Sequence, residues 1–392
     1  MSADPHDVAA AAARFADARD ELFDWYRGHG RDLLWRRTRD PYAVWVSEIM
    51  LQQTTVAAVT PFFERFVGRF PTVADLAAAD EDDVLAHWAG LGYYRRARHL
   101  HAAAKVVVDE HGGEFPRSVE GLHALPGVGR YTAGAIASFA FGLPAPIVEA
   151  NTVRLFARLL GEREVVTKSA AQKRLWAFAT RIVADAHDDG AEPATLNHAV
   201  MELGGAVCTP QNPDCVSCAM ASACVAYDEG LQDAIPRAAA KKKPVDRVDA
   251  TLLVRKAGRV LVRRRGPDEW WAGLWDFPRY ELPGGLADAT FPEADAAGRR
   301  SLPLDDPLAV EAADFLAASV RDETGIASSP GPLVGRIKHG VTVYRITLQC
   351  LTADATGGRL KSDCRWVTPA ELEDLALSSP GRRVATRFLA DG

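Results

Sequence analysis

Residues 125–133 read LPGVGRYTA, a glycine hairpin followed by the start of an expected helix. Gly127 and Gly129 are separated by one residue, and glycine allows backbone angles that turn successive N–H groups outward. At a helix N-terminus such groups favour an anion such as phosphate, because the helix dipole adds positive potential there. The hairpin therefore favours contact with a nucleic-acid backbone, although Pro-Gly-x-Gly also closes ordinary turns.

Two further stretches bear on the meaning of the hairpin. Residues 45–54 read WVSEIMLQQT and place one carboxylate, Glu48, inside an apolar helical run. Four cysteines follow later with the spacing C-x6-C-x2-C-x5-C, namely Cys208, Cys215, Cys218 and Cys224. Thiolates bind zinc as well as iron–sulfur clusters, but this unequal spacing is not the paired arrangement of zinc ribbons. The cysteines therefore favour a [4Fe–4S] cluster over zinc.

Together these stretches resemble the adenine DNA glycosylases of the MutY type, in the endonuclease III (helix-hairpin-helix) superfamily. The resemblance is dense over residues 20–230 and looser beyond. It implies a mainly α N-terminal region, the two-lobed helix-hairpin-helix glycosylase fold with an Fe–S cluster loop, and an α+β Nudix-like C-terminal domain. The expected divisions are a glycosylase domain at 8–229 with its cluster loop at 208–224, a polar linker at 230–247, and the Nudix-like domain at 248–392.

Length and composition agree with several domains but do not identify a nucleic-acid binder. At 392 residues the chain exceeds one ordinary core, and 52 acidic residues against 46 Lys and Arg give a net charge of −6. DNA binding must therefore rest on local geometry. The uncharged run at 131–148 is just long enough to consider a membrane span, but two glycines and two prolines interrupt it, which favours a buried helix and a loop.

Cysteine usage and the N-terminus predict the compartment. Four of the six cysteines are crowded into one segment, which suits an intracellular metal site better than a disulfide framework. Asp4, His6 and Asp7 precede any long apolar run and do not resemble a signal peptide. We expect a soluble, cytoplasmic, nucleoid-associated monomer that is not bound to a membrane.

Glu48 is the first catalytic candidate. Helical periodicity favours placing its carboxylate on the one wet edge of the helix; the alternative is a desolvated carboxyl with a raised pKa. A desolvated acid is what protonation of a leaving base near neutral pH requires.

Glu149 and Asn151 form the second candidate, in a segment where the resembled family has an aspartate followed by Gly-Asn and this chain has Glu149-Ala150-Asn151. A carboxylate facing the sugar would stabilise the oxocarbenium-like charge that develops as the base leaves. Glu149 keeps the charge but adds a methylene, and the alternative is a glutamate that caps the following helix.

Tyr131 occupies the position where strand-cutting relatives carry a Schiff-base lysine, which favours hydrolysis without lyase chemistry. We expect its hydroxyl to bond the carboxylate of Glu149, or to be an ordinary core tyrosine.

The resemblance also assigns DNA and base contacts. Arg36 would line the base pocket and Leu51 would form a pocket wall. Gln53 would fill the hole left by a flipped base, and Tyr93 would wedge beside the orphaned partner. The alternatives are a solvated loop arginine, a polar helix cap and the start of an amphipathic helix.

The C-terminal region resembles a Nudix-like domain from residues 270–278, WWAGLWDFP, onward. A Nudix hydrolase needs several carboxylates on one helix to hold magnesium, but Ala318-Ser319 stand where the box has Arg-Glu. The domain is therefore expected to read DNA rather than to hydrolyse nucleotides.

The family's Phe-Ser-His tip, which inspects 8-oxoguanine, falls on Val341-Thr342-Val343. Thr342 keeps the hydroxyl and the histidine is absent, so reading of 8-oxoguanine is the part of the resemblance least supported by residues. Cys350 and Cys364 resemble ordinary buried cysteines.

The expected function is excision of adenine mispaired with guanine or 8-oxoguanine in double-stranded DNA, by hydrolysis of the N-glycosidic bond and without lyase activity. The alternatives are a glycosylase of the same fold for thymine or uracil opposite guanine, a DNA-binding protein with an inactive site, and a nucleotide diphosphatase.

Overall fold

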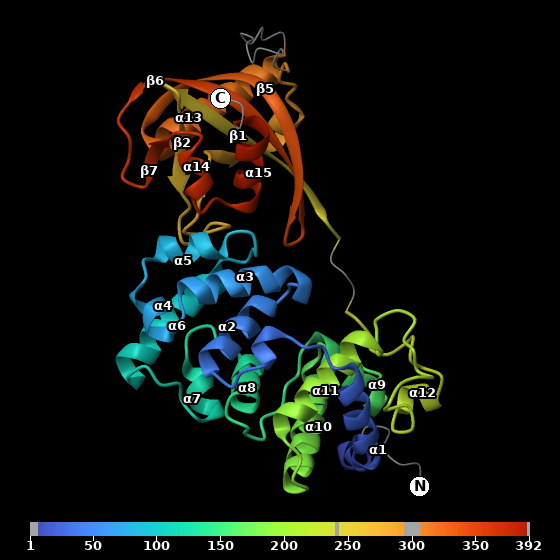
Figure 1. Ribbon diagram of the computed structural model, residues 1–392. Helices are drawn as coiled ribbons and strands as arrows, with labels where there is room; N and C mark the ends of the chain where they lie inside the picture. The colour runs from blue at the N-terminus through green and yellow to red at the C-terminus, as the bar shows by residue number, and fades with distance from the viewer. Residues whose placement is uncertain (1–6, 240–242, 294–305, 390–392) are drawn as a thin grey trace. The chain divides into compact units, whose positions relative to one another are not determined.

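The computed structural model describes residues 7–239, 243–293 and 306–389, and the chain divides into two compact units (Figure 1). Unit 1 comprises Met1–Ala79 and Arg98–Ala240, and unit 2 comprises Asp80–Ala97 and Lys241–Gly392. Residues 80–97 thus cluster with the C-terminal part of the chain. Lys241 and Lys242 of the expected linker, and residues 294–305 of the expected Nudix-like domain, lie outside the described residues.

Unit 1 is helical, as the resemblance predicted. Its elements are α1 (Val8–His29), η1 (Leu34–Arg36), α2 (Pro41–Leu51), α3 (Val56–Arg69), α4 (Val73–Ala78), most of α6 (Arg95–His111), α7 (Val119–Ala124), α8 (Arg130–Phe139), α9 (Ala150–Leu160), α10 (Ser169–Asp188), α11 (Pro193–Ala206) and α12 (Val225–Asp228). Helix α2 begins at Pro41, a residue suited to the first turn of a helix, and the Asp40 side chain accepts bonds from two backbone N–H groups.

Helices α1, α9, α10 and α11 pack together around one apolar core. Phe178 of α10 lies in this core and meets Phe15 of α1 and Phe156 of α9 edge to face, with ring centroids 6.0 and 5.5 Å apart. Edge-to-face rings are a favourable arrangement, and their fixed geometry sets how the helices sit against one another. This packing holds the start of α9, where Glu149 lies, on a rigid support.

The glycine hairpin joins α7 to α8 as the sequence indicated. Gly127 has φ +74°, and Gly129 is the N-cap residue of α8 with no side-chain hydrogen bond to the helix. Residues 132–139 of α8 are all buried, and a Cβ on Gly134 would meet the Pro146 carbonyl oxygen at 2.3 Å. The uncharged run is therefore a buried helix and a following loop. No helix in the described part of the chain is long and apolar enough to cross a membrane.

Unit 2 contains a mixed sheet with strand order β3-β2-β1-β6-β5, in which β4 pairs with β1 and β7 with β2. The strands are β1 (Val245–Lys256), β2 (Arg259–Arg264), β3 (Trp275–Asp276), β4 (Arg279–Glu281), β5 (Ile326–Val341), β6 (Tyr344–Gly358) and β7 (Cys364–Val367). The helical elements are α5 (Glu81–Trp88), η2 (Gly284–Asp288), α13 (Pro307–Thr324), α14 (Glu371–Asp374) and α15 (Ser379–Phe388). Strands β1 and β6 run parallel, and the other pairs are antiparallel.

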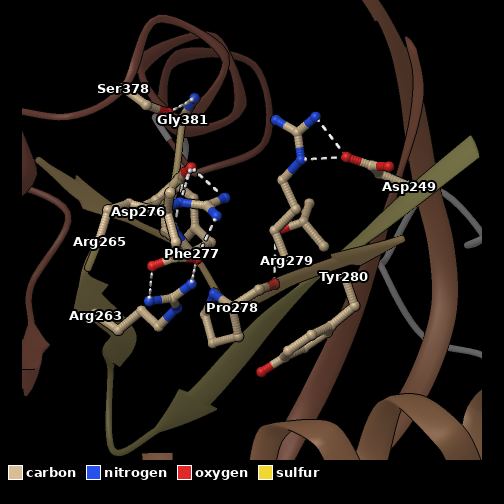
Figure 2. A network of polar contacts seen from close by, with 12 residues as sticks. Asp249, Arg263, Arg265, Asp276, Phe277, Pro278, Arg279, Tyr280, Ser378 and Gly381 are labelled. Carbon is tan, nitrogen blue, oxygen red and sulfur yellow. Dashed lines mark hydrogen bonds and ion pairs between the residues drawn. The ribbon is translucent and has the colours of Figure 1, made fainter. Parts of the chain in front are cut away.

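Buried arginine–carboxylate pairs tie the strands of unit 2 together (Figure 2). Arg279 of β4 donates to Asp249 of β1 at 2.6 Å, and both side chains are almost fully buried. Arg265 donates to Asp276 of β3 at 3.1 Å. Removing one partner of such a pair leaves an uncompensated buried charge, which is strongly destabilising. These arginines are therefore part of the core of unit 2 and are not exposed for phosphate contact.

Replacing Gly127 by alanine should destabilise unit 1. Its φ of +74° disfavours any side chain, and an added Cβ would lie 2.4 Å from the His99 Cβ. We expect a loss of about 1–3 kcal/mol in unfolding free energy. Denaturant titration followed by far-UV circular dichroism measures it.

Gly129→Ala is the matched control, two residues away in the same hairpin. Nothing lies within 4 Å of an added Cβ there, and its φ of −79° suits alanine. A Gly129→Ala protein as unstable as Gly127→Ala would contradict this account of the hairpin.

Candidate active site

Unit 1 carries a cleft of about 830 Å³ between η1, α2, the glycine hairpin, α8, α9 and α11. It brings together nine of the residues that the sequence analysis assigned to catalysis or DNA contact: Arg36, Glu48, Leu51, Gln53, Gly127, Gly129, Tyr131, Glu149 and Asn151. The two carboxylates, which are distant in the chain, thus face one shared space. Tyr93 and Thr342 belong to unit 2 and do not line this cleft.

Glu48 is buried at 4% exposure, so the periodicity that favoured a wet helix edge was misleading. The reason is that α2 is buried from Tyr42 to Met50, including the polar Ser47, because α3 and α8 pack against it. Burial raises the pKa of Glu48 to about 7, against an ordinary value of 4.5, while a hydrogen bond from Tyr131 and the charge of Arg36 oppose the rise. The carboxyl group can therefore hold a proton near neutral pH.

Tyr131 donates its hydroxyl to Glu48 Oε2 at 2.6 Å, so the expected bond to Glu149 is wrong. Tyr131 is the second residue of α8, whereas the Glu149 carboxylate is held at the start of α9. Burial and the neighbouring Glu48 raise the pKa of Tyr131 well above its ordinary value. Tyr131 therefore acts as a neutral donor that fixes the orientation of the Glu48 carboxyl.

Glu149 is the N-cap residue of α9, which is the capping role considered from the sequence. Its Oε1 accepts from the backbone N–H groups of Asn151 at 2.9 Å and Thr152 at 3.2 Å. The Thr152 side chain completes a capping box with the Glu149 backbone. The Glu149 side chain also lines the cleft, so capping holds one of its carboxylate oxygens in a fixed position beside the catalytic space. A catalytic role for Glu149 stays a prediction.

Arg36 lines the cleft and is held by Glu202, a residue that the sequence analysis did not select. Glu202 is 1% exposed on α11 and accepts from Arg36 Nη1 at 2.6 Å and from Arg31 Nε at 2.9 Å. A buried carboxylate needs such paired donors. The available signal was a lone glutamate within an apolar helical run, the same pattern that drew notice to Glu48.

Backbone strain marks three of the predicted DNA contacts. Gln53, Tyr93 and Thr342 have φ values of 58°, 49° and 52°, and only three other described non-glycine residues have a positive φ. Gln53 and Thr342 are exposed, and Tyr93 is 61% exposed. Thr342 sits in the two-residue turn between β5 and β6, where a β-branched residue is disfavoured. Such strain costs about 1–3 kcal/mol and is found mainly at functional sites.

The four clustered cysteines line a small cavity of unit 1, together with residues of α9. None forms a disulfide, and Arg158 Nη1 donates to Cys208 Sγ at 3.1 Å. No three or more His, Cys, Asp or Glu side chains in the described ranges are gathered to hold a metal ion. The four free thiols around one cavity nevertheless match the four thiolates that hold an iron–sulfur cluster. Those thiolates bind separate iron atoms, so they need not converge on a single ion.

In unit 2, the segment that most resembles a Nudix box contains Glu323, and this carboxylate is already paired. Glu323 at the end of α13 pairs with Arg263 at 2.9 Å and accepts from the Tyr280 hydroxyl at 2.6 Å. Cys350 and Cys364 are buried, as expected.

Comparison with known proteins identifies both regions. Residues 46–181 match the HhH-GPD superfamily of base excision DNA repair proteins, and residues 250–387 match the NUDIX domain. A solved structure of a thermostable thymine-DNA glycosylase aligns with a TM-score of 0.50 and 29% identity, over 55% of this chain and 97% of that one. The helix-hairpin-helix fold and the cleft thus define a base excision repair protein of this superfamily.

Curated relatives narrow the class. The adenine DNA glycosylase of Buchnera aphidicola (Schizaphis graminum) is 33% identical over 66% of this chain and 74% of its own length. That of Mus musculus is 36% identical over 72% of this chain and 64% of its own length. The thymine-DNA glycosylase of Aeropyrum pernix is 35% identical over 55% of this chain. The chain belongs to the adenine DNA glycosylase family, and it spans 58–64% of the length of the mammalian relatives it matches.

Replacing Glu48 by glutamine should stabilise the protein at neutral and alkaline pH. The folded state holds the Glu48 proton more tightly than the unfolded state. The contribution of this group to folding stability is therefore full below pH 4.5 and is lost as the pH rises through 7. Glutamine does not ionise and can still accept from Tyr131. Above pH 8, we expect the free energy of unfolding of the variant to exceed that of the wild type by about 3 kcal/mol. This difference should close toward pH 4.

Thermal unfolding of both proteins from pH 4 to 9 measures this difference. Glu64→Gln, at an exposed position of α3, controls for the loss of one negative charge. A difference between Glu48→Gln and wild type that stays constant with pH would contradict the desolvated carboxyl.

Proposed function

We propose that this protein is a monofunctional DNA glycosylase that hydrolyses the N-glycosidic bond of adenine mispaired with guanine or 8-oxoguanine. The observation that carries the proposal is the buried Glu48 carboxyl, with a pKa near 7, in a cleft that also holds Glu149. Membership of the adenine DNA glycosylase family supports the choice of base. We further propose that it acts on double-stranded DNA as a monomer in the cytoplasm, associated with the nucleoid.

The exposed hairpin glycines supply the DNA contact in this scheme. Gly127 and Gly129 are both exposed at the rim of the cleft, and the N–H groups of the first turn of α8 follow them. Phosphate is favoured there by the helix dipole. Gln53, exposed and held at a positive φ beside the same cleft, enters the space that the extruded base leaves, and Leu51 forms part of the pocket wall.

Glu48 then acts as the general acid. Protonated near neutral pH, it donates its proton to a ring nitrogen of the leaving adenine, and as a carboxylate it activates the attacking water. Tyr131 keeps the carboxyl oriented through its 2.6 Å bond. Since Tyr131 has no amine, it forms no Schiff base with the sugar, and the reaction ends at hydrolysis.

Glu149 stabilises the positive charge that develops on the sugar. The two bonds from the α9 backbone go to Oε1, and within the described residues Oε2 accepts none, so this oxygen is available to the cleft. An anion fixed by a helix start stabilises a cationic transition state without reorganising during the reaction. Asn151 adjoins it in the cleft, with its Oδ1 accepting from Arg154 at 3.0 Å.

A second candidate is excision of thymine or uracil opposite guanine. It is favoured by the likeness of unit 1 to thymine-DNA glycosylases and by the Glu149-Ala150 pair in place of the expected Asp-Gly. Those relatives match only about half of this chain, whereas the adenine DNA glycosylases match more of it.

Reading of 8-oxoguanine would fall to Thr342 at the exposed β5–β6 turn, together with Tyr93 beside the partner base.

We also propose that Cys208, Cys215, Cys218 and Cys224 hold a [4Fe–4S] cluster. Four free thiols around one cavity support it, and so does their unequal spacing. When bound, the cluster would cross-link the loop at 208–224 and so fix it for contact with DNA.

Adenine should be released from duplexes that pair it with guanine or 8-oxoguanine under single-turnover conditions. Thymine and uracil opposite the same partners should remain, and strands should break only after alkali treatment. Glu48→Gln should lose about 10²–10⁴-fold in rate, because general acid catalysis is worth that much, while duplex binding persists. Glu64→Gln is the control. Release of thymine in place of adenine would select the second candidate, and release of no base would leave a DNA-binding protein.

The purified protein should contain iron and sulfide and absorb in the visible range. Cys218→Ser should reduce bound iron and lower the melting temperature, because the cluster cross-links the loop, whereas Cys350→Ser in unit 2 should leave the iron content unchanged. Zinc in place of iron would contradict the cluster.

A further inference from the structure

One arginine beside the glycine hairpin has no part in the proposed mechanism. Arg130 is the first residue of α8, is exposed and lines the cleft. Across the described residues its guanidinium has no hydrogen bond or ion pair. A cation at a helix N-terminus is disfavoured by the helix dipole, so α8 itself gains nothing from this charge.

The Arg130 side chain is nevertheless ordered, because its guanidinium stacks on an indole ring. Its Cζ atom lies 3.7 Å from the centroid of the Trp176 ring on α10. Trp176 is half-buried and packs against the apolar core formed by α1, α9, α10 and α11. The stack therefore joins the hairpin to a helix from another part of the chain and fixes a side chain that is ordinarily mobile at a surface.

Stacking leaves the donors of the guanidinium available. Its N–H groups lie in the plane of the group and point outward from its edge, so a face that rests on a ring does not occupy them. Two such N–H groups match two oxygens of a phosphate. Lys173, three residues before Trp176 on the same face of α10, is exposed and also has no ion pair across the described residues. This surface thus presents ordered, uncompensated positive charge.

A purely structural role for the stack is the alternative. An exposed cation–π contact is weak, and immobilising an arginine costs conformational entropy of comparable size. The stack therefore adds little to folding stability. The same ordering lowers the entropic cost of binding an anion later, because the side chain is already in place. Binding thus accounts for the stack better than folding does.

Resting on the proposed function, we propose that Arg130 binds a phosphate of the DNA backbone beside the one at the hairpin N–H groups, and that Trp176 is the positioning residue that presents it. The contact contributes affinity and reads no base. Trp176 acts only through Arg130 in this arrangement.

The test measures duplex affinity against salt concentration, because each phosphate contact adds a fixed amount to the slope of log Kd against log salt. The duplex carries adenine opposite guanine, and each substitution is made in Glu48→Gln protein so that the base stays in place. Arg130→Ala should weaken binding about tenfold at about 50 mM salt and lower the slope by about 0.9.

Two further substitutions separate charge from positioning. Arg130→Lys keeps the charge but loses the planar fork, so affinity should fall about threefold with the slope retained. Trp176→Leu keeps apolar packing but removes the ring, and should also weaken binding about threefold without changing the slope. Arg181→Ala is the matched control, since Arg181 is exposed on α10 and already paired with Asp185 at 2.7 Å; it should change neither quantity.

Melting temperatures of all variants are recorded with the affinities. An Arg130→Ala protein that keeps the affinity and slope of its Glu48→Gln parent overturns the proposal, and a lowered melting temperature would then leave the stack as a structural contact. If Arg130→Ala does not fold, Trp176→Leu decides: weaker binding with the slope retained supports the proposal, and unchanged affinity overturns it. Failure of the wild type to bind any duplex or to excise adenine overturns the proposed function instead.

Discussion

The bond between Tyr131 and Glu48 is the contact on which the organisation of the cleft depends. Burying a carboxyl in α2 disfavours its charged form, and the raised pKa of Glu48 expresses that cost. A hydrogen bond that opposes this cost comes from Tyr131 in the first turn of α8, immediately after the glycine hairpin. The hairpin therefore has two tasks. Its exposed glycines are the proposed contact for a phosphate backbone, and its geometry places the tyrosine that bonds Glu48.

The opposite wall of the cleft is linked to the cysteine loop through α9. Glu149 caps this helix, and Arg154, one turn further along, bonds the Cys208 carbonyl at 2.5 Å and also donates to the Gly204 carbonyl. Arg158, a turn later, donates to Cys208 Sγ and to the Thr209 carbonyl. Two buried arginines on one helix thus join the start of the cysteine loop to the element that holds Glu149. A loop held in this way can affect the site through the position of α9, without supplying any chemistry to the reaction.

The sequence predicted the elements better than the contacts. The spacing of glycines and cysteines located the hairpin and the cysteine group, because glycine and cysteine act through local geometry or chemistry. Periodicity failed for Glu48, since a helix that is packed on several sides has no wet edge and its burial depends on α3 and α8, which lie elsewhere in the chain. The sequence did not reveal the partner of Tyr131 or the role of Glu202, because both contacts join segments that lie far apart in the chain.

A net charge of −6 does not by itself favour contact with DNA, but several acidic groups near the cleft are neutralised by their neighbours. Glu202 is paired with Arg31 and Arg36, and Glu192 with Arg39. Glu48, with its pKa near 7, is substantially protonated at neutral pH. Because interactions between exposed charges are screened over roughly 10 Å in salt, distant surface carboxylates contribute little to the potential felt by a phosphate at the hairpin. What that phosphate meets is the outward N–H groups at the start of α8, so local geometry, and not the overall charge, determines whether this surface can accept DNA.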